Sequence, residues 1–404
     1  MKKIKRILSI LLVCLLMVSL VACGSSKSND KADEDKAETA DKTEKAKDDS
    51  SKEEAAEEPS EKEEVKDDSE AEEAEDAEAA TDDSEIFIGL SMPTFAEERW
   101  VYDTNAMQAY CEEKGYKLVH AVADGDSNKQ KEQCATMITQ GVDVLILAPN
   151  DGDAAATIVE EAKDAGVYVV SYDRLVTGTD LVDVYITFDS WYMGEINGKY
   201  IVDNLEEKFG EVKGNVVLLK GDPGDSNAPQ YFGGAYQHLE PYIESGAINV
   251  ISENDCMGWK PEEATKHVEN AMSIADAEGI TIDAVLAPND GTAGGVIAAL
   301  GDDLAKETII TGMDAEVAAV QRILEGTQSM TSWGDTREMG MTAVDVAVAL
   351  VKDGSYPTET SEKGTDADGN EIDVPSVRLP AVFIDENNAH ILIDEGYHSA
   401  EDYE

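Results

Sequence analysis

The chain has 404 residues and is strongly acidic, with 86 aspartate and glutamate residues, 32 lysine and arginine residues and a formal net charge of −54. This charge argues against nucleic acid as a partner, because the phosphate backbone would be repelled. Only five cysteines are present, too sparse a set for a disulfide framework.

The N-terminus has the pattern of a secretory signal. Four basic residues precede an apolar run over residues 7–20, which is too short to be read as a spanning helix. The sequence Leu-Val-Ala-Cys at 20–23 resembles a bacterial lipobox, which implies that the signal, residues 1–23, ends in a lipid-carrying Cys23. We therefore expect an extracytoplasmic protein, lipid-anchored to the bacterial cell membrane. An ordinary signal peptide with a chance cysteine is the alternative.

Residues 24–85 form a polar tract without an aromatic residue. The tract contains 27 acidic side chains and nine lysines, so 18 negative charges have no basic counterpart. A segment of this composition cannot bury enough apolar surface to fold. We expect an acidic disordered tether, which serves either as a spacer through a cell wall or as a solubilising brush.

From residue 86 onward, strands and helices alternate with short connections, which predicts parallel sheets with right-handed crossovers. Short runs rich in β-branched residues predict buried strands at 86–92, 116–123, 142–148, 167–172 and 184–188. Helical patterns lie between them at 97–114, 127–140 and 153–165, each with a glycine at or just past its end.

A second set of elements follows residue 189. Strands are predicted at 215–220, 248–252, 282–287, 308–312 and 329–332, and helices begin near Trp191, Ser226, Pro261, Thr292 and Glu316. A last helix is predicted at 336–351, and the chain can cross between domains there and at 374–384. About 320 residues are too many for one compact core. We expect two Rossmann-like α/β domains, an N-terminal one at 86–188 and 333–376 and a C-terminal one at 189–332 and 377–404.

One unit occurs twice: the sequence Ala-Pro-Asn-Asp-Gly stands at 148–152 and again at 287–291, each time after a short apolar run. The repeat indicates that one strand-to-loop unit was built into each domain. In open parallel sheets, ligands bind beyond the carboxyl ends of the strands, so such loops are expected to face a cleft between the domains.

Motifs for catalysis are not found. The sequence has no dinucleotide-binding glycine motif, phosphate loop or nucleophile elbow, so we expect neither a cofactor nor an enzyme. The five histidines lack the spacing of metal ligands. Residues 366–370 faintly resemble a calcium loop, but a hairpin turn through Asp368-Gly369 is the better interpretation. Cys111 and Cys134 are expected to be buried thiols, although a pair in an oxidising setting stays open.

Polar and aromatic residues gather at the predicted carboxyl ends of strands in both halves. A sugar needs this mixture, because carboxylates, amides and guanidinium groups bind vicinal hydroxyls while an aromatic face covers the C–H face of the ring. The candidates are Arg99, Trp100, Asp173, Arg174, Asp225, Ser226, Asn227, Trp259, Asn289, Asp290 and Asp314. Each has an ordinary structural explanation when taken alone, but their recurrence after successive strands favours a binding site.

At these residues the chain resembles a family, the periplasmic sugar-binding proteins of ABC importers, in the branch of xylose-binding and multiple-monosaccharide-binding proteins. The resemblance covers about residues 86–404. Its landmarks, in chain order, are I-G-L-S-M-P-T at 88–94, E-R-W at 98–100, S-Y-D-R at 171–174, Y-I-T-F-D at 185–189, G-D-S-N-A at 224–228, G-W-K-P at 258–261, P-N-D-G-T-A-G-G at 288–295, G-M-D-A-E at 312–316, D-T-R-E at 335–338 and V-P-S at 374–376.

The resemblance implies which residues bind an aldopyranose: Arg99, Asp173, Arg174, Asn227, Trp259, Asn289 and Asp314, with Trp100 as a stacking platform. It implies that Asn289 of the second repeat reaches the sugar, whereas Asn150 of the first serves its turn and helix cap. Gly334 stands where the family commonly has a lysine, and stacking by Trp333 is expected to compensate. Domain closure is implied by a three-segment hinge near 188–189, 332–333 and 374–379.

The sequence therefore predicts a monomeric binding protein that captures a monosaccharide such as xylose, glucose, galactose or arabinose. It would deliver this sugar to the permease and ATPase of an ABC importer, without metal or cofactor. A sensor that presents the sugar to a chemoreceptor or kinase is an alternative. A surface carbohydrate-active enzyme, with two carboxylates about 5–10 Å apart, is another.

Overall fold

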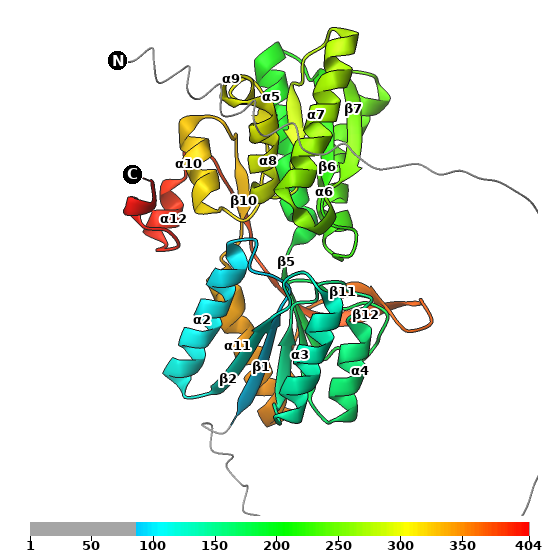
Figure 1. Cartoon of the computed structure of the whole chain (residues 1–404), viewed down its shortest axis with the longest axis vertical. Helices are drawn as coiled ribbons and strands as arrows, with labels where there is room; N and C mark the ends of the chain where they lie inside the picture. Colours follow the sequence, from blue (N-terminus) through cyan, green and yellow to red (C-terminus); the bar gives the residue numbers. More distant parts are fainter. Residues whose placement is uncertain (1–85, 404) are drawn as a thin grey trace, which may run out of the picture. The chain divides into compact units, whose positions relative to one another are not determined.

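The computed structural model describes residues 86–403, and its elements form two lobes (Figure 1). The predicted signal, Cys23 and the acidic tether lie outside these residues. Within the described part, every helix is too short or too polar to traverse a bilayer. The predicted fold class, α/β with parallel sheets in two Rossmann-like lobes, is confirmed.

The N-terminal lobe contains a seven-stranded sheet in the order β11-β12-β5-β4-β3-β1-β2. Its strands are β1 (Phe87–Met92), β2 (Lys117–Val122), β3 (Val144–Leu147), β4 (Tyr168–Tyr172), β5 (Val184–Phe188), β11 (Thr360–Thr365) and β12 (Glu371–Leu379). All neighbours pair in parallel except β11 and β12. The central strands β1 and β3 are buried along their whole length, which explains their continuous apolar sequences.

Helices cover both faces of this sheet. On one face, α2 (Arg99–Lys114) packs against α11 (Thr336–Asp353), and their apolar residues share a core with Ile88 and Leu90 of β1. On the other face lie α3 (Ser127–Thr139) and α4 (Ala156–Asp164), which share a second core with Phe87. Successive residues of β1 therefore enter opposite cores, as the alternation of side chains along a strand requires.

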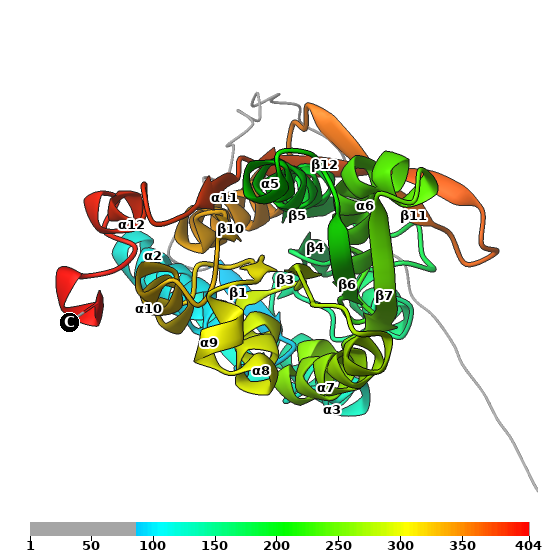
Figure 2. The same ribbon diagram turned by 90° about the horizontal axis from the view of Figure 1, so that it is seen from above.

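The C-terminal lobe contains a four-stranded parallel sheet in the order β7-β6-β8-β9. Its strands are β6 (Gly214–Lys220), β7 (Ile248–Asp255), β8 (Ala284–Leu286) and β9 (Ile309–Ile310). Two helices lie on each face (Figure 2): α5 (Ser190–Phe209) and α6 (Ala228–Glu244) on one, and α7 (Pro261–Glu278) and α8 (Asp290–Leu300) on the other. Shorter helices α9 (Asp302–Ala305) and α10 (Val317–Glu325) follow.

Close helix packing explains two glycines of the C-terminal lobe, Gly234 and Gly295. A Cβ atom at Gly234 of α6 would lie 2.0 Å from the backbone oxygen of Trp191, and one at Gly295 of α8 would lie 2.2 Å from the backbone oxygen of Pro261. Only glycine allows these backbones to approach so closely, because any side chain would collide with a main-chain atom.

The chain crosses between the lobes three times: from β5 to α5, from β10 (Thr331–Trp333) to α11, and from β12 to β13 (Val382–Ile384). Strands β10 and β13 form a small antiparallel sheet. The predicted domain break after residue 376 falls inside β12, which stays in the seven-stranded sheet as far as Leu379. The C-terminal α12 (His390–Asp394) and 3₁₀ helix η3 (Ala400–Tyr403) complete the chain, with η3 in contact with α10.

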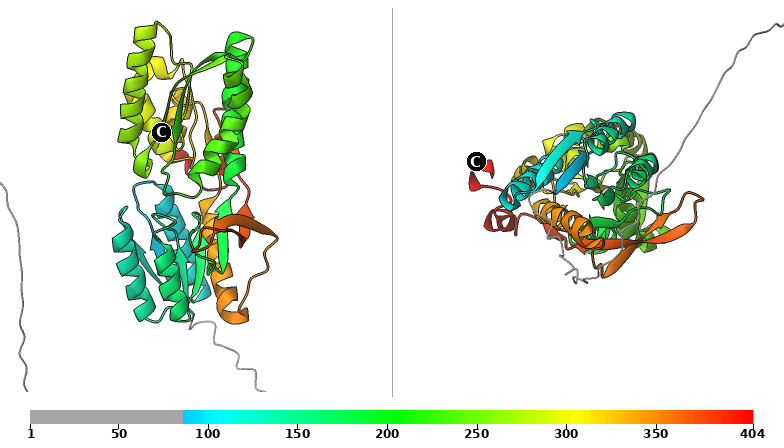
Figure 3. Two further views of the ribbon diagram at one scale, coloured as in Figure 1. Left: turned by 90° about the vertical axis from the view of Figure 1, so that its right-hand side faces the viewer. Right: turned by 90° about the horizontal axis from the view of Figure 1, so that it is seen from below.

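The hairpin of β11 and β12, which projects beside the N-terminal lobe (Figure 3), was not predicted as a pair of strands. Its turn confirms the preferred interpretation of residues 366–370. One carboxylate oxygen of Asp366 accepts the backbone N–H groups of Asp368 and Asn370, and Gly369 adopts φ 79°. The acidic sequence thus stabilises a tight turn, and the described residues contain no cluster of metal-ligating side chains.

Candidate functional site

The predicted site residues come from loops at the carboxyl ends of strands in both lobes. Arg99 and Trp100 open α2 after β1, and Asp173 and Arg174 follow β4. In the C-terminal lobe, Trp259 lies in the 3₁₀ helix η2 (Met257–Trp259) after β7, Asn289 follows β8 and Asp314 follows β9. These seven residues line one cavity, together with Glu97, Asp225, Tyr231 and Met313. We call this cavity the cleft site.

Buried ion pairs connect the two lobes across the cleft site. Arg99 Nη2 lies 2.7 Å from Asp173 Oδ2 in its own lobe, and Arg99 Nη1 lies 3.8 Å from Asp314 Oδ1 in the other. Arg174 Nε lies 2.7 Å from Asp225 Oδ2, again across the lobes. All five side chains are buried, so each charge needs its partner because water is excluded.

Burial and charge set the pKa values of these groups. Burial by itself would lower the pKa of Arg99, but Asp173, Asp103 and Asp314 together raise it well above its usual value. Burial raises the pKa of Asp314 well above the ordinary aspartate value, although Arg99 opposes the shift. Burial likewise raises the pKa of Asp225, and Arg174 opposes that shift. The site therefore holds a permanent guanidinium charge beside carboxyl groups that are costly to ionise.

Trp100 holds the two arginines in place. Its indole N–H donates a 2.8 Å hydrogen bond to Glu97 Oε2. The guanidinium carbons of Arg99 and Arg174 lie over its ring, 4.5 and 5.2 Å from the centroid. Such cation–π contacts orient both guanidinium groups. The predicted role of Trp100 as a stacking platform for a sugar stays a prediction.

Trp259 forms part of the wall of the cleft site from the other lobe. It adopts φ 55°, packs edge-on against Tyr231 with 6.3 Å between ring centroids, and lies over Gly221, where a Cβ atom would be 2.3 Å from the indole. The strained backbone and the glycine beneath it hold the ring in this position. Tyr231, one turn into α6, had no signal in the sequence, because only helix packing brings it to the site.

Among the eight residues that the family resemblance implies, Asn227 is the one that does not line the cleft site. Its Nδ2 donates a 2.7 Å hydrogen bond to the backbone oxygen of Asp173, and its Oδ1 accepts one of 2.9 Å from the hydroxyl of Tyr185. Asp173 needs this support because it has φ 62°, an unfavourable conformation for a residue with a side chain. In this structure Asn227 positions Asp173.

Asn289 begins α8 with a capping box. Its Oδ1 accepts the backbone N–H of Thr292 at 2.9 Å, and the hydroxyl of Thr292 accepts the backbone N–H of Asn289 at 3.1 Å. The cap uses the amide oxygen, so the Nδ2 group is left to serve as a donor in the cleft site. Next to it, Asp290 is fully buried and accepts hydrogen bonds from Gln328, Thr331 and the backbone of Glu316.

The first repeat has a different role from the expected one. Asn150 donates a 2.9 Å hydrogen bond to the hydroxyl of Ser127 in α3 and does not cap a helix. The turn is capped by Asp151, whose carboxylate accepts the N–H of Ala154 at 2.8 Å. The predicted helix cap at Asn150 is therefore wrong, because α4 begins only at Ala156, with Ala155 in the N-cap position.

The expected stacking role of Trp333 is corrected, and the glycine at 334 has a steric explanation. Trp333 does not line the cleft site. It packs edge-on against Tyr397, 5.2 Å between ring centroids, in a separate apolar cluster. A Cβ atom at Gly334 would lie 2.3 Å from the ring of Phe188, so this chain has no room for a side chain where the family commonly has lysine.

The three described cysteines, including Cys111 and Cys134, are buried free thiols, as expected.

Several buried polar atoms of the cleft site lack a hydrogen-bond partner. They are Arg99 Nη2, Asp173 Oδ2, Arg174 Nε and Trp259 Nε1. The first three belong to ion pairs that are close but poorly aligned as hydrogen bonds. Trp259 Nε1 has no partner of either kind. Unsatisfied buried groups are costly and rare, so this indole N–H beside the ion-paired groups indicates a site for hydroxyl-bearing ligands. The cavity measures only about 20 Å³, room for roughly one water, so a larger ligand requires the lobes to separate and close around it.

The chain is similar to known sugar-binding proteins. The model of a family described as "periplasmic binding protein domain" matches residues 88–355. The D-xylose-binding periplasmic protein of Escherichia coli is 36% identical over 316 residues, which cover 78% of this chain and 91% of that protein. A multiple sugar-binding periplasmic protein of Azospirillum brasilense is 35% identical over 324 residues, 77% of this chain and 89% of that protein.

Solved structures are similar as well. A carbohydrate transporter solute-binding protein from Chloroflexus aurantiacus, in complex with D-glucose, superimposes with a TM-score of 0.72 at 33% identity and covers 79% of this chain and 98% of its own. An ABC transporter solute-binding protein from Clostridium phytofermentans, with bound β-D-glucose, has the same TM-score at 32% identity, with coverage of 79% and 100%.

Proposed function

Since this chain belongs to the family of periplasmic binding proteins, we propose that it captures a monosaccharide in the cleft site and delivers it to an ABC importer. It is a binding protein and performs no chemistry. The observation that carries the proposal is the cavity between the two lobes, which is lined by guanidinium, carboxylate, amide and indole groups and includes the buried, unpartnered N–H of Trp259. Hydroxyl groups of a pyranose donate and accept, so they suit guanidinium, carboxylate and indole groups at once.

The ligand would replace contacts that the protein makes with itself. Arg99 and Asp173 pair at 2.7 Å, and a hydroxyl placed between them would donate to the carboxylate and accept from the guanidinium. The proposed direct ligands are Arg99, Asp173, Arg174, Trp259, Asn289 and Asp314, with Trp100 beneath the arginines. The cross-lobe pair of Arg174 and Asp225 then closes the lobes on the bound sugar.

Calorimetric titration with D-xylose, D-glucose, D-galactose, L-arabinose and D-ribose tests the function. The relatives bind xylose or several sugars by name, and the similar structures hold glucose, so we expect the tightest binding for xylose or glucose. Absence of heat and of a thermal shift with all five sugars would overturn the proposal. Delivery to an importer is tested by uptake of the bound sugar in cells with and without the gene for this chain.

Membrane anchoring through Cys23 is part of the same proposal. The lipobox at 20–23 and the acidic tract at 24–85 support a folded part that is held outside the membrane on a tether. Replacement Cys23→Ala is expected to release the protein from membranes into the soluble fraction. Retention of the variant in the membrane fraction would contradict lipidation of this residue. A monomer is proposed as well, and sedimentation of the chain measures it.

A further inference from the structure

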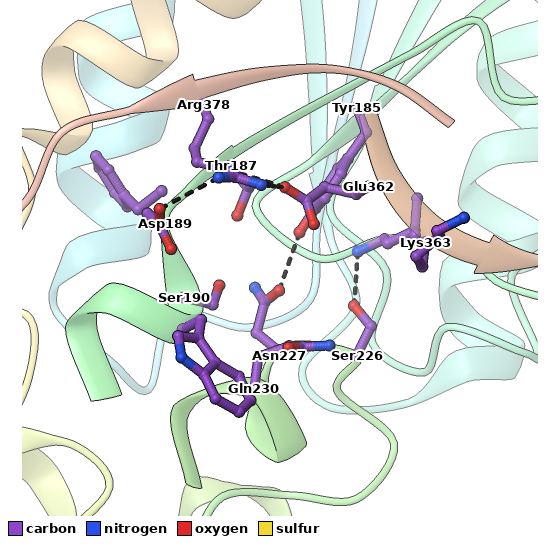
Figure 4. Close-up of a pocket in the computed structure, with 13 residues that line it drawn as sticks. Tyr185, Thr187, Asp189, Ser190, Ser226, Asn227, Gln230, Glu362, Lys363 and Arg378 are labelled. Atoms are coloured by element: carbon purple, nitrogen blue, oxygen red, sulfur yellow. Dashed lines mark hydrogen bonds and ion pairs between the residues drawn. The ribbon is translucent and has the colours of Figure 1, made fainter. Parts of the chain in front are cut away.

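A second, larger cavity lies beside the hinge, on the other side of Asp173 from the cleft site. Its wall includes Thr187 of β5, Ser190 and Trp191 of α5, Asn227 and Gln230 at the start of α6, and Arg378 of β12 (Figure 4). We call it the hinge pocket. Its volume is about 350 Å³, compared with about 20 Å³ at the cleft site. This volume falls in the range of small-molecule sites.

Asp173 joins the two cavities. Its carboxylate lines the cleft site. Its backbone oxygen accepts hydrogen bonds from Tyr185, Thr187 and Asn227, at 2.8, 3.1 and 2.7 Å, and these three residues line the hinge pocket. The hinge pocket is therefore a separate space that shares a wall with the cleft site.

A buried hydroxyl points into the hinge pocket without a partner. Ser190 is 7% exposed, and its Oγ has no hydrogen-bond partner among the described residues. Figure 4 shows its side chain directed into the space between Thr187 and Asn227. Buried hydroxyls normally find a partner, as that of Thr104 in α2 does with the backbone oxygen of Trp100. The orphan hydroxyl marks a place where a ligand group would complete a hydrogen bond.

The charged groups of the hinge pocket are already neutralised by protein partners. Arg378 Nε donates a 2.9 Å hydrogen bond to Glu362, and its Nη1 lies 3.2 Å from Asp189. Lys363 is paired with Glu371 and Asp373 on the hairpin, at 2.9 and 3.0 Å. An ionic ligand would have to break these pairs, so the wall favours a neutral molecule.

An exposed aromatic ring completes the wall. Trp191 is 43% exposed, and its ring lies over Gly233 of α6, where a Cβ atom would be 2.7 Å from a ring carbon. Glycine at 233 therefore lets the indole lie flat against α6 beside the pocket. An indole beside hydroxyl and amide groups is the combination that suits the C–H face and the hydroxyls of a polyhydroxylated ring.

We propose that the hinge pocket is a second binding site, for a neutral polyhydroxylated molecule such as a sugar or polyol unit. Residues of both lobes line it, so a ligand there would hold the lobes in the arrangement seen in the structure. The inference does not depend on the proposed function, because only Ser226 and Asn227 of its lining residues belong to the predicted candidates and neither lines the cleft site.

Calorimetry of the full chain with D-glucose and myo-inositol as probes tests this site. The variant Asn289→Ala weakens the cleft site about 100-fold, and we expect it to retain a separate, saturable binding phase in the millimolar range. Adding Trp191→Ala should weaken this phase about tenfold, through loss of the stacking surface. Adding Ser190→Ala should weaken it about fivefold, through loss of one hydrogen bond.

Matched controls separate binding from folding. Tyr192→Ala removes the adjacent aromatic side chain, which is 47% exposed and does not line the hinge pocket, and should leave the weak phase unchanged. Ser190→Ala should also leave the melting temperature unchanged or raise it, because the deleted hydroxyl has no protein partner.

The possible results are distinct from those for the cleft site. Absence of the weak phase with both probes overturns the second site, and so does a weak phase that Trp191→Ala and Ser190→Ala leave intact. A wild-type chain without any tight phase, but with a weak phase that both variants reduce, would overturn the proposed function and support the hinge pocket.

Discussion

The two copies of Ala-Pro-Asn-Asp-Gly have the same sequence but different surroundings. In the first copy, Asn150 bonds to Ser127 of a neighbouring helix and Asp151 caps its own turn near solvent. In the second copy, Asn289 caps α8 from inside the cleft site, and Asp290 is fully buried with three hydrogen-bond donors. The difference shows that a short motif determines the backbone of a turn, whereas its packing determines the role of its side chains.

Replacements in the two copies should differ most in their effect on sugar affinity. Asn289→Ala removes the Nδ2 donor from the cleft site and leaves a sugar hydroxyl unpaired, so we expect binding to weaken about 100-fold. Asn150→Ala should change the affinity by less than about twofold, because Asn150 does not line the cleft site. Calorimetric titration measures both.

A second replacement separates the donor from the helix cap. Asn289→Asp keeps an oxygen for the cap but loses the amide donor. If Asn289→Asp bound the sugar as well as the wild-type chain, the proposed role of the amide group would be wrong.

Stability should respond to loss of the aspartate in each copy. Asp290→Ala leaves Gln328, Thr331 and the N–H of Glu316 without their shared acceptor in the core, so we expect a loss of about 3 kcal/mol in the free energy of unfolding. Asp151→Ala removes one exposed cap and should cost less than about 1 kcal/mol. Urea unfolding gives both values, and equal losses would show that burial does not distinguish the copies.

The asparagines of the two copies should differ by a smaller amount in their effect on stability. In the absence of sugar, Asn289→Ala is expected to cost about 1 kcal/mol, whereas Asn289→Ser retains a capping oxygen and should cost only a few tenths. Asn150→Ala should cost about 0.5 kcal/mol, because its amide bonds to a partly exposed serine. Thermal unfolding of the three variants measures this order, and a larger loss at Asn150 would contradict it.

The pH dependence should show the smallest difference, because many other carboxylates titrate in the same range. Burial, followed by the nearby charge of Glu316, raises the pKa of Asp290 from 3.8 to about 7. The folded chain therefore holds this proton more tightly than the unfolded chain. Its contribution to stability is fully present below pH 3.8 and is lost as the pH rises through about 7.

The replacement Asp290→Asn removes this titration. The melting temperature of the wild-type chain should fall relative to that of Asp290→Asn as the pH rises from about 4 to about 7. A constant difference between the two proteins over this range would mean that the carboxyl group of Asp290 titrates alike in the folded and unfolded chains.

Local patterns predicted most of the regular structure. The strand at 184–188 and the start of the helix at Pro261 coincide with β5 and α7, because β-branched residues and a proline at the first helical position act over a few residues. The ends of β8 and β9 were predicted too long, since pairing with neighbouring strands limits them to Ala284–Leu286 and Ile309–Ile310. The β11–β12 hairpin was missed because its polar strands lack an alternating apolar pattern.

The residues of the candidate site likewise fall into those that local patterns predicted and those that they missed. Eight of the eleven candidates placed at strand ends line one cavity, because parallel strands bring their carboxyl ends to one edge of a sheet. Tyr231 and the supporting role of Asn227 had no local signal, since both depend on how the start of α6 meets the other lobe.

The sequence by itself determined the order of strands and helices, the α/β class and the type of side chains at the strand ends. These features depend on the spacing of apolar residues, on turn residues and on side-chain chemistry, all of which act locally. Only the tertiary structure decided that Asn289 and Asp290 are buried while Asn150 and Asp151 are not, and that Ser190, Trp191 and Arg378 surround a second cavity. These outcomes depend on contacts between residues far apart in the chain, which no local pattern records.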